Sequence, residues 1–379
     1  MVALDNVQKS NAQIATTYPA GLVAVFAGAT AGIGETSLRE FARHTSKPRI
    51  YIVGRSQEAC DRLDADLKSV NPEGNYTFIR SDVSLLRNVD DVCRQIRDRE
   101  SAINVLFMSQ GTLNFSKQTE EGMSYLMSLT YFGRMRMARN LLPLLQRATG
   151  LRRVVSSFTG AKEGRAYDDD WQGKEGKVPF TAARGHGATM MTLGLETLAK
   201  EAPDVSFVHA FPGKVKTNII RSDDGAILRT VALVSKALFF VTGHTPIVEV
   251  GERHTFYCTS ARFPSKKPAD EPGAVGAKLP EGVSVANGVD GSVGGGVYSV
   301  DTYGESADAK VEELLANYRR DGTADKLWKY TETEIERLRR IINTDLKHAV
   351  EFIYSTASVV ATTPFGAGDN KDHEQEQGH

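Results

Sequence analysis

The stretch AVFAGATAGIGE, residues 24–35, decides the fold of this 379-residue chain. Its apolar first half is typical of a buried strand, its end opens a helical pattern, and Gly28, Gly32 and Gly34 stand at the turn between them. Glycine lets the chain turn sharply and lets a pyrophosphate reach the backbone amides at the positive end of a helix. In this strand–turn–helix context, the spacing G-x-x-x-G-x-G predicts a dinucleotide-binding site rather than an ordinary turn.

On both sides of the glycine turn, short apolar runs alternate with helical patterns, from Leu22 to about Phe211. Strands are predicted over residues 22–29, 48–55, 76–83, 103–110, 152–160 and 205–213, and helices over residues 34–45, 56–70 and 89–100. This alternation predicts an α/β fold, a Rossmann-type doubly wound parallel sheet with helices on both faces.

The rest of the sequence suggests a division into segments. Residues 1–19 form an N-terminal arm, and residues 20–260 hold the dinucleotide-binding and substrate domain. Residues 261–304 are rich in glycine and proline and are predicted as a long loop with at most a short hairpin. Residues 305–364 form a C-terminal helical extension, and the polar residues 365–379 are predicted to be disordered.

The composition is that of a soluble globular protein, with 41% hydrophobic residues, 25% charged residues and a net charge of −1. A net charge so close to zero argues against nucleic acid as a partner. Three widely spaced cysteines without a CxxC pair predict neither a metal site nor a disulfide framework, and they favour a reducing, cytoplasmic location. The first residues lack the pattern of a secretory signal.

The apolar residues 226–243 are the candidate for membrane contact. Arg229 and Lys236 interrupt them, and the segment is too short to span a hydrocarbon core of about 30 Å. The preferred interpretation is a helix that covers a pocket or a subunit interface. Peripheral contact with a membrane surface is the alternative.

Further motifs follow the glycine turn in the order typical of the short-chain dehydrogenase/reductase superfamily, which the chain resembles over residues 20–220. VGRS ends the second strand, SDV follows the third, a glycine follows the fourth, and FPGKVKT follows a later one. The resemblance implies that a nicotinamide dinucleotide is bound by Gly28, Thr30, Gly32, Ile33, Gly34, Arg55, Ser56, Asp82, Val83, Gly111, Pro212, Gly213, Val215 and Thr217.

The residues at the end of the second strand indicate which dinucleotide binds. A carboxylate there suits the free ribose 2′-hydroxyl of NAD(H), whereas a cation suits the 2′-phosphate of NADP(H). In this chain Gly54 stands at the carboxylate position, and Arg55 comes next with Ser56 beside it. Because the planar guanidinium matches a phosphate, the sequence favours NADP(H).

The catalytic residues that the resemblance implies are only partly present. Ser157 stands at the position of the family serine that orients a substrate carbonyl, and Thr130 replaces the relay asparagine without its helix-kinking role. The family's Tyr-x-x-x-Lys motif does not occur in the sequence. One alignment places Arg184 at the tyrosine position and Ala188 at the lysine position. A second alignment, with a gap, places Phe180 and Arg184 there, and the first is preferred.

The spacer between Ser157 and the next helix is longer than in compact family members and contains AYDDDW, which resembles the retinol-dehydrogenase-like branch. Arg184 is predicted to stabilise an oxyanion or to bind a carboxylate or phosphate. His186 is a candidate acid. Tyr167 in the spacer is a candidate replacement for the missing phenol, with packing as its expected role.

Three functions are compatible with this pattern. The preferred one is NADP(H)-dependent reduction of a carbonyl, enone or imine of an apolar small molecule, because the family's substrate lid corresponds here to the apolar residues 219–241. The alternatives are a non-redox cyclase, isomerase or dehydratase, and a catalytically inactive NADP-binding protein. The C-terminal extension resembles that of fungal members of specialised metabolism, and the family implies a homodimer unless the extension covers its interface.

Overall fold

The computed structural model describes residues 1–215 and 244–340. The chain divides into two units, Met1–Ile335 and Glu336–His379, and only the helical residues 336–340 of the second are described. The sheet, the helices around it and the candidate site all belong to the first unit. The apolar stretch 226–243 and the tail 365–379, both singled out in the sequence, lie outside the described residues.

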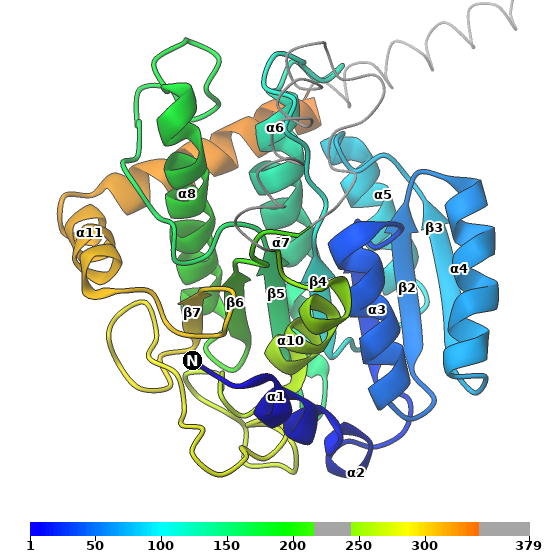
Figure 1. Ribbon diagram of the computed structural model, residues 1–379. Helices are drawn as coiled ribbons and strands as arrows, with labels where there is room; N and C mark the ends of the chain where they lie inside the picture. Colours follow the sequence, from blue (N-terminus) through cyan, green and yellow to red (C-terminus); the bar gives the residue numbers. More distant parts are fainter. Residues whose placement is uncertain (216–243, 341–379) are drawn as a thin grey trace, which may run out of the picture. The chain divides into compact units, whose positions relative to one another are not determined.

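One sheet of seven parallel strands forms the centre of the first unit, in the order β3-β2-β1-β4-β5-β6-β7 (Figure 1). The strands are β1 Val23–Ala27, β2 Arg49–Gly54, β3 Asn75–Arg80, β4 Val105–Met108, β5 Arg153–Ser157, β6 Ser206–Ala210 and β7 Val297–Val300. The strand order reverses between β1 and β4, and doubly wound sheets bind ligands in the crevice at such a reversal. The predicted α/β fold is confirmed.

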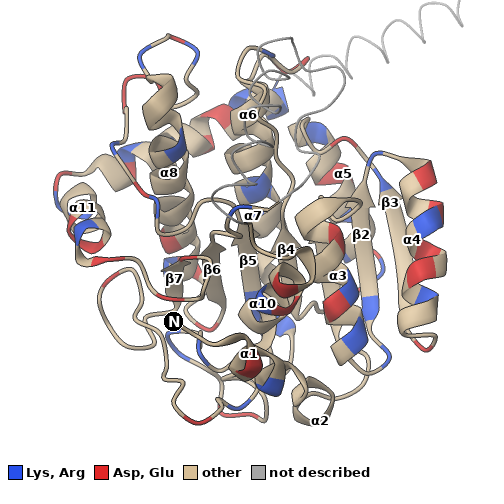
Figure 2. Cartoon of the chain, in the orientation of Figure 1, with Lys and Arg blue, Asp and Glu red and all other residues tan. Residues whose placement is uncertain are grey.

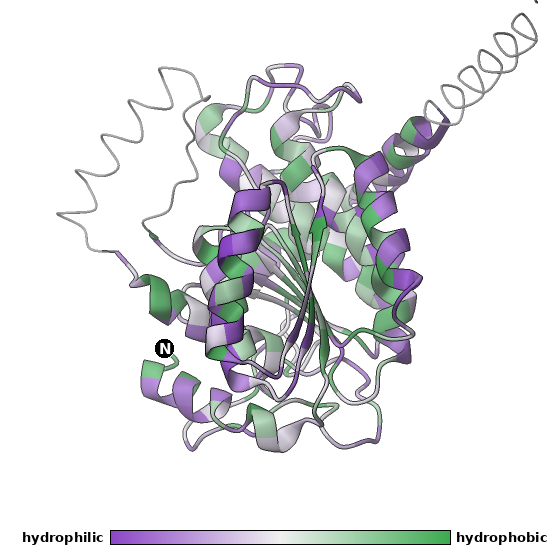
Figure 3. Ribbon diagram, turned by 90° about the vertical axis from the view of Figure 1, so that its right-hand side faces the viewer, coloured by the Kyte–Doolittle hydropathy of each residue, from purple (hydrophilic) through white to green (hydrophobic). Residues whose placement is uncertain are grey.

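Helices cover both faces of this sheet. On one face α4 (Gln57–Val70), α3 (Gly32–His44) and α10 (Ile247–Thr259) lie side by side, and on the other lie α5 (Leu86–Arg97), α7 (Gly133–Arg147) and α8 (Phe180–Glu201). Charged residues of both signs are spread over outer helices such as α3 and α4 (Figure 2). The strands form a hydrophobic layer seen edge-on between helices that carry hydrophilic residues on their outer surfaces (Figure 3).

Burial on both faces explains why the strands read as continuous apolar runs. All five residues of β1 are buried. The ring of Phe26 on β1 stacks on that of Phe107 on β4 with a centroid distance of 5.1 Å, and it meets Phe41 of α3 at 5.4 Å. These contacts join the strand before the glycine turn to the helix after it, which fixes the geometry of the turn itself.

The N-terminal arm is helical and packs on α10. It consists of α1 (Leu4–Asn11) and α2 (Ile14–Thr17), and the side chains of Val7 and Ile14 are fully buried. Asn11 donates a hydrogen bond through Nδ2 to the Oε2 atom of Glu252 on α10 at 2.6 Å. The arm is therefore part of the core of the first unit.

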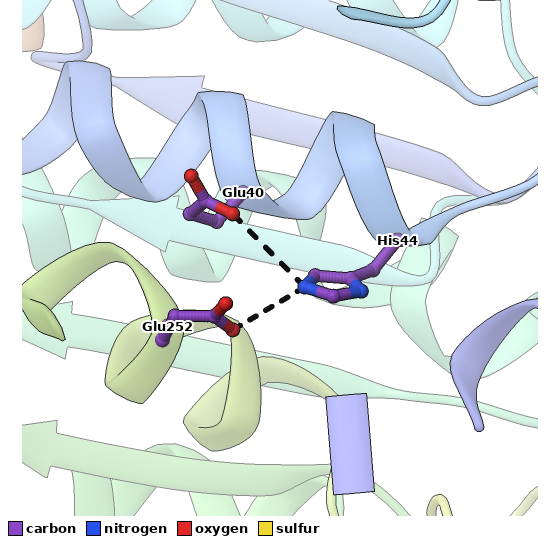
Figure 4. A group of neighbouring side chains, drawn as sticks. All are labelled: Glu40, His44 and Glu252. Atoms are coloured by element: carbon purple, nitrogen blue, oxygen red, sulfur yellow. Dashed lines mark ion pairs between the residues drawn. The ribbon is translucent and has the colours of Figure 1, made fainter. Parts of the chain in front are cut away.

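A cluster of Glu40, His44 and Glu252 ties α3 to α10 (Figure 4). His44 Nε2 lies 3.2 Å from Glu252 Oε2 and 4.0 Å from Glu40 Oε2. Burial tends to raise the pKa of Glu252, but hydrogen bonds from His44 and Asn11 outweigh it and lower the pKa. One ligand atom of each residue lies within 4.8 Å of the others. Because these pairings and the Arg43–Glu40 ion pair account for the arrangement, we assign the cluster a structural role.

Strand β7 is a feature that the sequence prediction missed. It lies inside residues 261–304, which were predicted as a loop with at most a short hairpin, and it extends the sheet by pairing with β6, for example Val208 with Tyr298. Tyr298 is fully buried, its ring meets that of Phe263 at 5.3 Å, and its hydroxyl donates to the carbonyl oxygen of Pro264. Tertiary contacts, rather than local pattern, thus define this strand of four residues.

The described part of the C-terminal extension packs on α7 and α8. It contains α11 (Ala309–Arg320) and the helical residues 323–335. Arg319 of α11 pairs with Glu196 of α8 at 2.8 Å, and Arg139 of α7 pairs with Glu332 at 2.8 Å. Among the described helices, none combines the length and the apolar character that crossing a membrane requires.

Candidate active site and cofactor cleft

A cleft opens at the carboxyl ends of β1 to β4, where the strand order reverses. Its lining comes from the glycine turn, from the ends of the neighbouring strands, and from one residue of the segment before α7. The lining residues are Gly28, Thr30, Ala31, Gly32, Ile33, Gly34, Val53, Gly54, Arg55, Ser81, Asp82, Val83, Ser109, Gln110, Gly111 and Leu129. Nine of the predicted cofactor contacts are therefore gathered in one place: Gly28, Thr30, Gly32, Ile33, Gly34, Arg55, Asp82, Val83 and Gly111.

The glycine turn has no room for side chains at two positions. Gly28 has a φ of +77°, and a Cβ atom there would lie 2.4 Å from the backbone nitrogen of Gln110. A Cβ atom on Gly34 would lie 2.4 Å from the carbonyl oxygen of Gly28. Because only hydrogen atoms fit here, the backbone amides at the start of α3 stay accessible from the cleft, as binding of a pyrophosphate requires.

The end of β2 carries a glycine followed by an arginine at the edge of the cleft. A Cβ atom on Gly54 would lie 2.2 Å from Thr30 Cγ2, so a larger residue at this position would require the Thr30 side chain to move. The side chain of Arg55 is 41% exposed, and its Nη1 atom lies 3.1 Å from the hydroxyl of Tyr125 and 3.7 Å from Asp82 Oδ2. A neighbouring hollow is lined by Arg55 and Arg80 together with Asp82 and Asp91, so residues of both charges lie at this end of the cleft.

Ser56 lies outside the cleft lining. Its Oγ atom accepts a hydrogen bond from the backbone N–H of Ala59 and caps α4. Pro212, Gly213 and Val215 follow β6 and do not line the cleft either, and Thr217 lies outside the described residues. Gly213 has a φ of +88° and packs against Thr302, so the structure gives it a role in the turn.

Gln110 is a cleft residue that sequence reasoning missed. It is 6% exposed, and neither its Oε1 nor its Nε2 atom has a hydrogen-bond partner within the described part of the chain. An unpaired buried amide costs roughly 1–3 kcal/mol, and a ligand that offers both a donor and an acceptor removes this cost. The position of Gln110 next to Gly111, after β4, was the sequence feature that could have identified it as a cleft residue. The orphaned amide and the tight glycine turn fit a bound dinucleotide.

Ser157 ends β5, and its hydroxyl is engaged with a histidine that the sequence did not single out. Ser157 Oγ lies 2.9 Å from the Nε2 atom of His254 on α10. The Nδ1 atom of the same ring lies 2.7 Å from the carbonyl oxygen of Val250. Burial lowers the pKa of His254 to about 4, so its ring is neutral at neutral pH. The two residues are 97 positions apart in the sequence, and no local pattern connects them.

Arg134 holds the ends of β4 and β5 together. Its side chain is 1% exposed and donates hydrogen bonds to Ser156 Oγ at 2.8 Å, to the carbonyl oxygen of Ser157 at 3.0 Å and to that of Gln110. All three of these acceptors are uncharged. Burial lowers the pKa of Arg134 to about 9, which leaves the guanidinium charged at neutral pH. A positive charge that lacks an anionic partner among these contacts is thus fixed behind Ser157.

The structure of the segment before α7 differs from the prediction for Thr130. It consists of α6 (Tyr125–Met127) and the π-helical segment η1 (Ser128–Phe132), which contains Thr130. The hydroxyl of Thr130 donates to the carbonyl oxygen of Leu126, four residues earlier, at 2.7 Å. A threonine was expected not to distort the helix, yet the helix is distorted here, as π-helical turns near functional sites often are.

Arg184 lies near the end of β6, whereas His186 does not face the site. The guanidinium of Arg184 lies 4.6 Å from the ring centroid of Phe211, the residue that follows β6. His186 is buried, its Nδ1 accepts from the backbone N–H of Tyr167, and its Nε2 lies 3.2 Å from the carbonyl oxygen of Trp171. Both nitrogens of His186 therefore hold the spacer to α8. We do not retain the predicted acid role, because neither nitrogen is left for a substrate.

Neither alignment of the missing motif supplies a phenol in the structure. Phe180, the tyrosine equivalent of the second alignment, is 70% exposed and packs on Phe115. Tyr167 packs against His186 at 5.8 Å and under the guanidinium of Arg165 at 4.9 Å. The polar groups at the end of β5 are Ser157, with His254 behind it, and the carbonyl oxygens held by Arg134.

Comparison with known proteins agrees with this architecture. The family model described as short chain dehydrogenase matches residues 22–224. Oxidoreductase AN1596 of Emericella nidulans is 36% identical over 340 residues, which cover 89% of this chain and 99% of that protein. Oxidoreductase notO of an Aspergillus species, named as containing an NmrA-like family domain, is 37% identical over 88% of this chain and 94% of its own.

A solved structure of an uncharacterised protein from Mycobacterium paratuberculosis has a TM-score of 0.50 and 18% identity, over 85% of this chain and 97% of that one. This likeness concerns the fold alone. The family match covers more than half of the chain, and the fungal relatives span nearly all of it. The chain therefore belongs to the short-chain dehydrogenase family of oxidoreductases, as a member of fungal type.

Proposed function

We propose that this protein is an NADP(H)-dependent oxidoreductase that acts on an apolar small molecule. The observation that carries the proposal is the cleft at the β1–β4 reversal, which is lined by a tightly packed glycine turn, an orphaned amide and a guanidinium. Each group has a matching part in the cofactor. The turn suits the pyrophosphate, Gln110 suits a polar group that both donates and accepts, and Arg55 suits the 2′-phosphate.

In this proposal the chain's own residues hold the cofactor and orient the reacting groups. The amides at the start of α3 bind the pyrophosphate, and Arg55 selects the phosphorylated ribose over the free one. When bound, the nicotinamide supplies or accepts the hydride. Arg134 keeps the strand ends around Gln110 and Ser157 in place, and its charge favours negative charge that develops on a substrate oxygen.

The sequence prediction of a carbonyl, enone or imine substrate belongs to this proposal. The apolar residues 219–241, on which the prediction of an apolar substrate rests, lie outside the described residues. A place in fungal specialised metabolism and a cytoplasmic location are proposed on the family resemblance and on the three free, buried cysteines.

Two measurements on the purified full-length protein test the proposal. The first is titration with NADPH and with NADH, followed by NADPH fluorescence and by the melting temperature; tighter binding of NADPH is expected. The second follows cofactor absorbance with four probes: 2-decalone, carvone and 3,4-dihydroisoquinoline with NADPH, and 2-decalol with NADP⁺. Turnover of any probe supports the redox function. Tight NADPH binding without turnover of any of them contradicts it and favours a non-redox enzyme or a binding protein.

A further inference from the structure

The hydrogen bonds around His254 have a fixed direction. The carbonyl oxygen of Val250 only accepts, so the neutral ring must carry its proton on Nδ1 to donate to it at 2.7 Å. Nε2 then has a lone pair and no proton. The hydroxyl of Ser157, 2.9 Å away, must therefore donate its proton to Nε2.

Packing holds the imidazole in this orientation. His254 is 1% exposed, and its ring meets the rings of Phe107 and Tyr257 edge-on at 5.5 and 5.4 Å. A ring confined by two aromatic neighbours and two hydrogen bonds does not flip without losing both bonds. The direction of the Ser157 proton is therefore built into the contact between α10 and the end of β5.

The consequence is that Ser157 offers only lone pairs to a substrate group that approaches it. A ketone oxygen is itself an acceptor, so it would have to draw the Ser157 proton away from His254. That would leave a buried ring nitrogen unpaired, which weakens binding by roughly 5- to 150-fold. A hydroxyl group, in contrast, donates to Ser157 and leaves the bond to His254 intact.

The charge of Arg134 favours a hydroxyl over the other possible hydrogen-bond donor, a protonated imine. The guanidinium of Arg134 donates to the carbonyl oxygen of Ser157 itself, and none of its three acceptors is charged. A cationic substrate nitrogen at Ser157 would be repelled by this buried charge. A substrate oxygen that gains negative charge as its proton leaves would be stabilised by it.

We propose that His254 positions Ser157 by accepting a hydrogen bond from its hydroxyl, so that the site binds the alcohol form of the substrate. This inference rests on the proposed function.

The first test needs no substrate and no cofactor. Nitrogen NMR of the protein labelled with ¹⁵N-histidine reports which ring nitrogen of His254 carries the proton, and the His254→Gln variant assigns the signal. We expect a neutral ring protonated on Nδ1, with an Nε2 resonance that shifts in Ser157→Ala. A proton on Nε2, or an Nε2 resonance that is unchanged in Ser157→Ala, overturns the proposal even if NADPH binds tightly.

The second test is a double-mutant cycle on oxidation of 2-decalol with NADP⁺. His254→Phe keeps a ring between Phe107 and Tyr257 but removes the acceptor, and Ser157→Ala removes the hydroxyl. If His254 acts through Ser157, each single variant lowers kcat by at least about 5-fold, and the double variant is no slower than Ser157→Ala. His254→Gln, whose amide oxygen can accept, restores part of kcat.

Binding of NADP⁺, followed by its effect on the melting temperature, is the control in the wild type and the four variants and should be the same in all of them. Losses that multiply in the double variant show that His254 acts independently of Ser157 and overturn the proposal. A His254→Phe protein with the wild-type kcat also overturns the proposal. Loss of NADP⁺ binding in the wild type refutes the proposed function instead, while the NMR result still decides the direction of the proton.

Discussion

Replacing Gly28 by alanine tests the geometry of the cofactor turn. The residue has a φ of +77°, and any residue with a Cβ atom costs about 1–2 kcal/mol in the left-handed region. The added Cβ atom would also lie 2.4 Å from the backbone nitrogen of Gln110, where ordinary contact begins at 3.4 Å, so the turn or the end of β4 must move by about 1 Å. Overpacking of this kind costs a further 1–3 kcal/mol or so.

Gly122 provides a matched control. Its φ is +73°, it is exposed, and nothing lies within 4 Å of an added Cβ atom. Gly122→Ala should therefore lower the free energy of unfolding by about 1–2 kcal/mol and leave the Kd for NADPH unchanged. Gly28→Ala should lower it by about 2–5 kcal/mol and weaken NADPH binding at least about 10-fold, because the amides of the turn are displaced.

The assay is urea denaturation of both variants and the wild type, with NADPH fluorescence titration at low temperature, where the destabilised variant remains folded. A Gly28→Ala protein that matches Gly122→Ala in both stability and affinity would refute the reasoning. It would mean that the end of β4 moves freely, and the tight turn would then carry no information about the ligand.

The other predictions concern charge. Arg55→Ala should weaken NADPH about 10- to 100-fold and NADH by less than about 3-fold, measured by fluorescence titration, and equal losses would exclude a phosphate contact. Arg134→Met should lower the free energy of unfolding, measured by urea denaturation, by at least about 2 kcal/mol, because two strand-end carbonyl oxygens lose their hydrogen-bond donor. An unchanged free energy of unfolding would show that Arg134 does not hold the ends of β4 and β5 together. The pKa of Glu252 is lowered in the folded protein, so its stabilising effect is present above its unfolded pKa of about 4.3 and is lost as the pH falls through the folded value. Between pH 3 and pH 7 the melting temperature should therefore fall less steeply on acidification in Glu252→Gln than in the wild type. An equal pH dependence in the two proteins would show that ionisation of Glu252 is not linked to folding.

Local pattern was sufficient to predict the first six strands and the glycine turn. All of these strands except the partly exposed edge strand β3 are short, largely buried runs, and the glycine turn is encoded within twelve consecutive residues. The same holds for the placement of Asp82 and Gly111 in the lining of the cleft, because a position directly after a parallel strand already fixes a place at the crevice.

The groups around Ser157 depend instead on long-range packing. His254 reaches Ser157 from a helix 97 residues later, and Arg134 reaches it from 23 residues earlier. No periodicity in the sequence links these positions. His186 illustrates the converse: it was a candidate acid, but the fold of the spacer, through Tyr167 and Trp171, uses both of its nitrogens.

Strand β7 was missed for a related reason. Its four residues, Val297–Val300, stand in a glycine-rich segment that is typical of a loop, and only the free edge of β6 and the ring of Phe263 make them a strand. The π-helical segment around Thr130 is equally invisible in the sequence, because a threonine has no strong preference for that geometry.

The most direct test of the account is calorimetric titration of the wild-type protein with NADPH and NADH under identical conditions. We expect one NADPH bound per chain, with an affinity at least about 10-fold higher than for NADH, because Arg55 pairs with the additional phosphate. Absence of binding heat with both dinucleotides, together with an unchanged melting temperature, would contradict the assignment of the cleft.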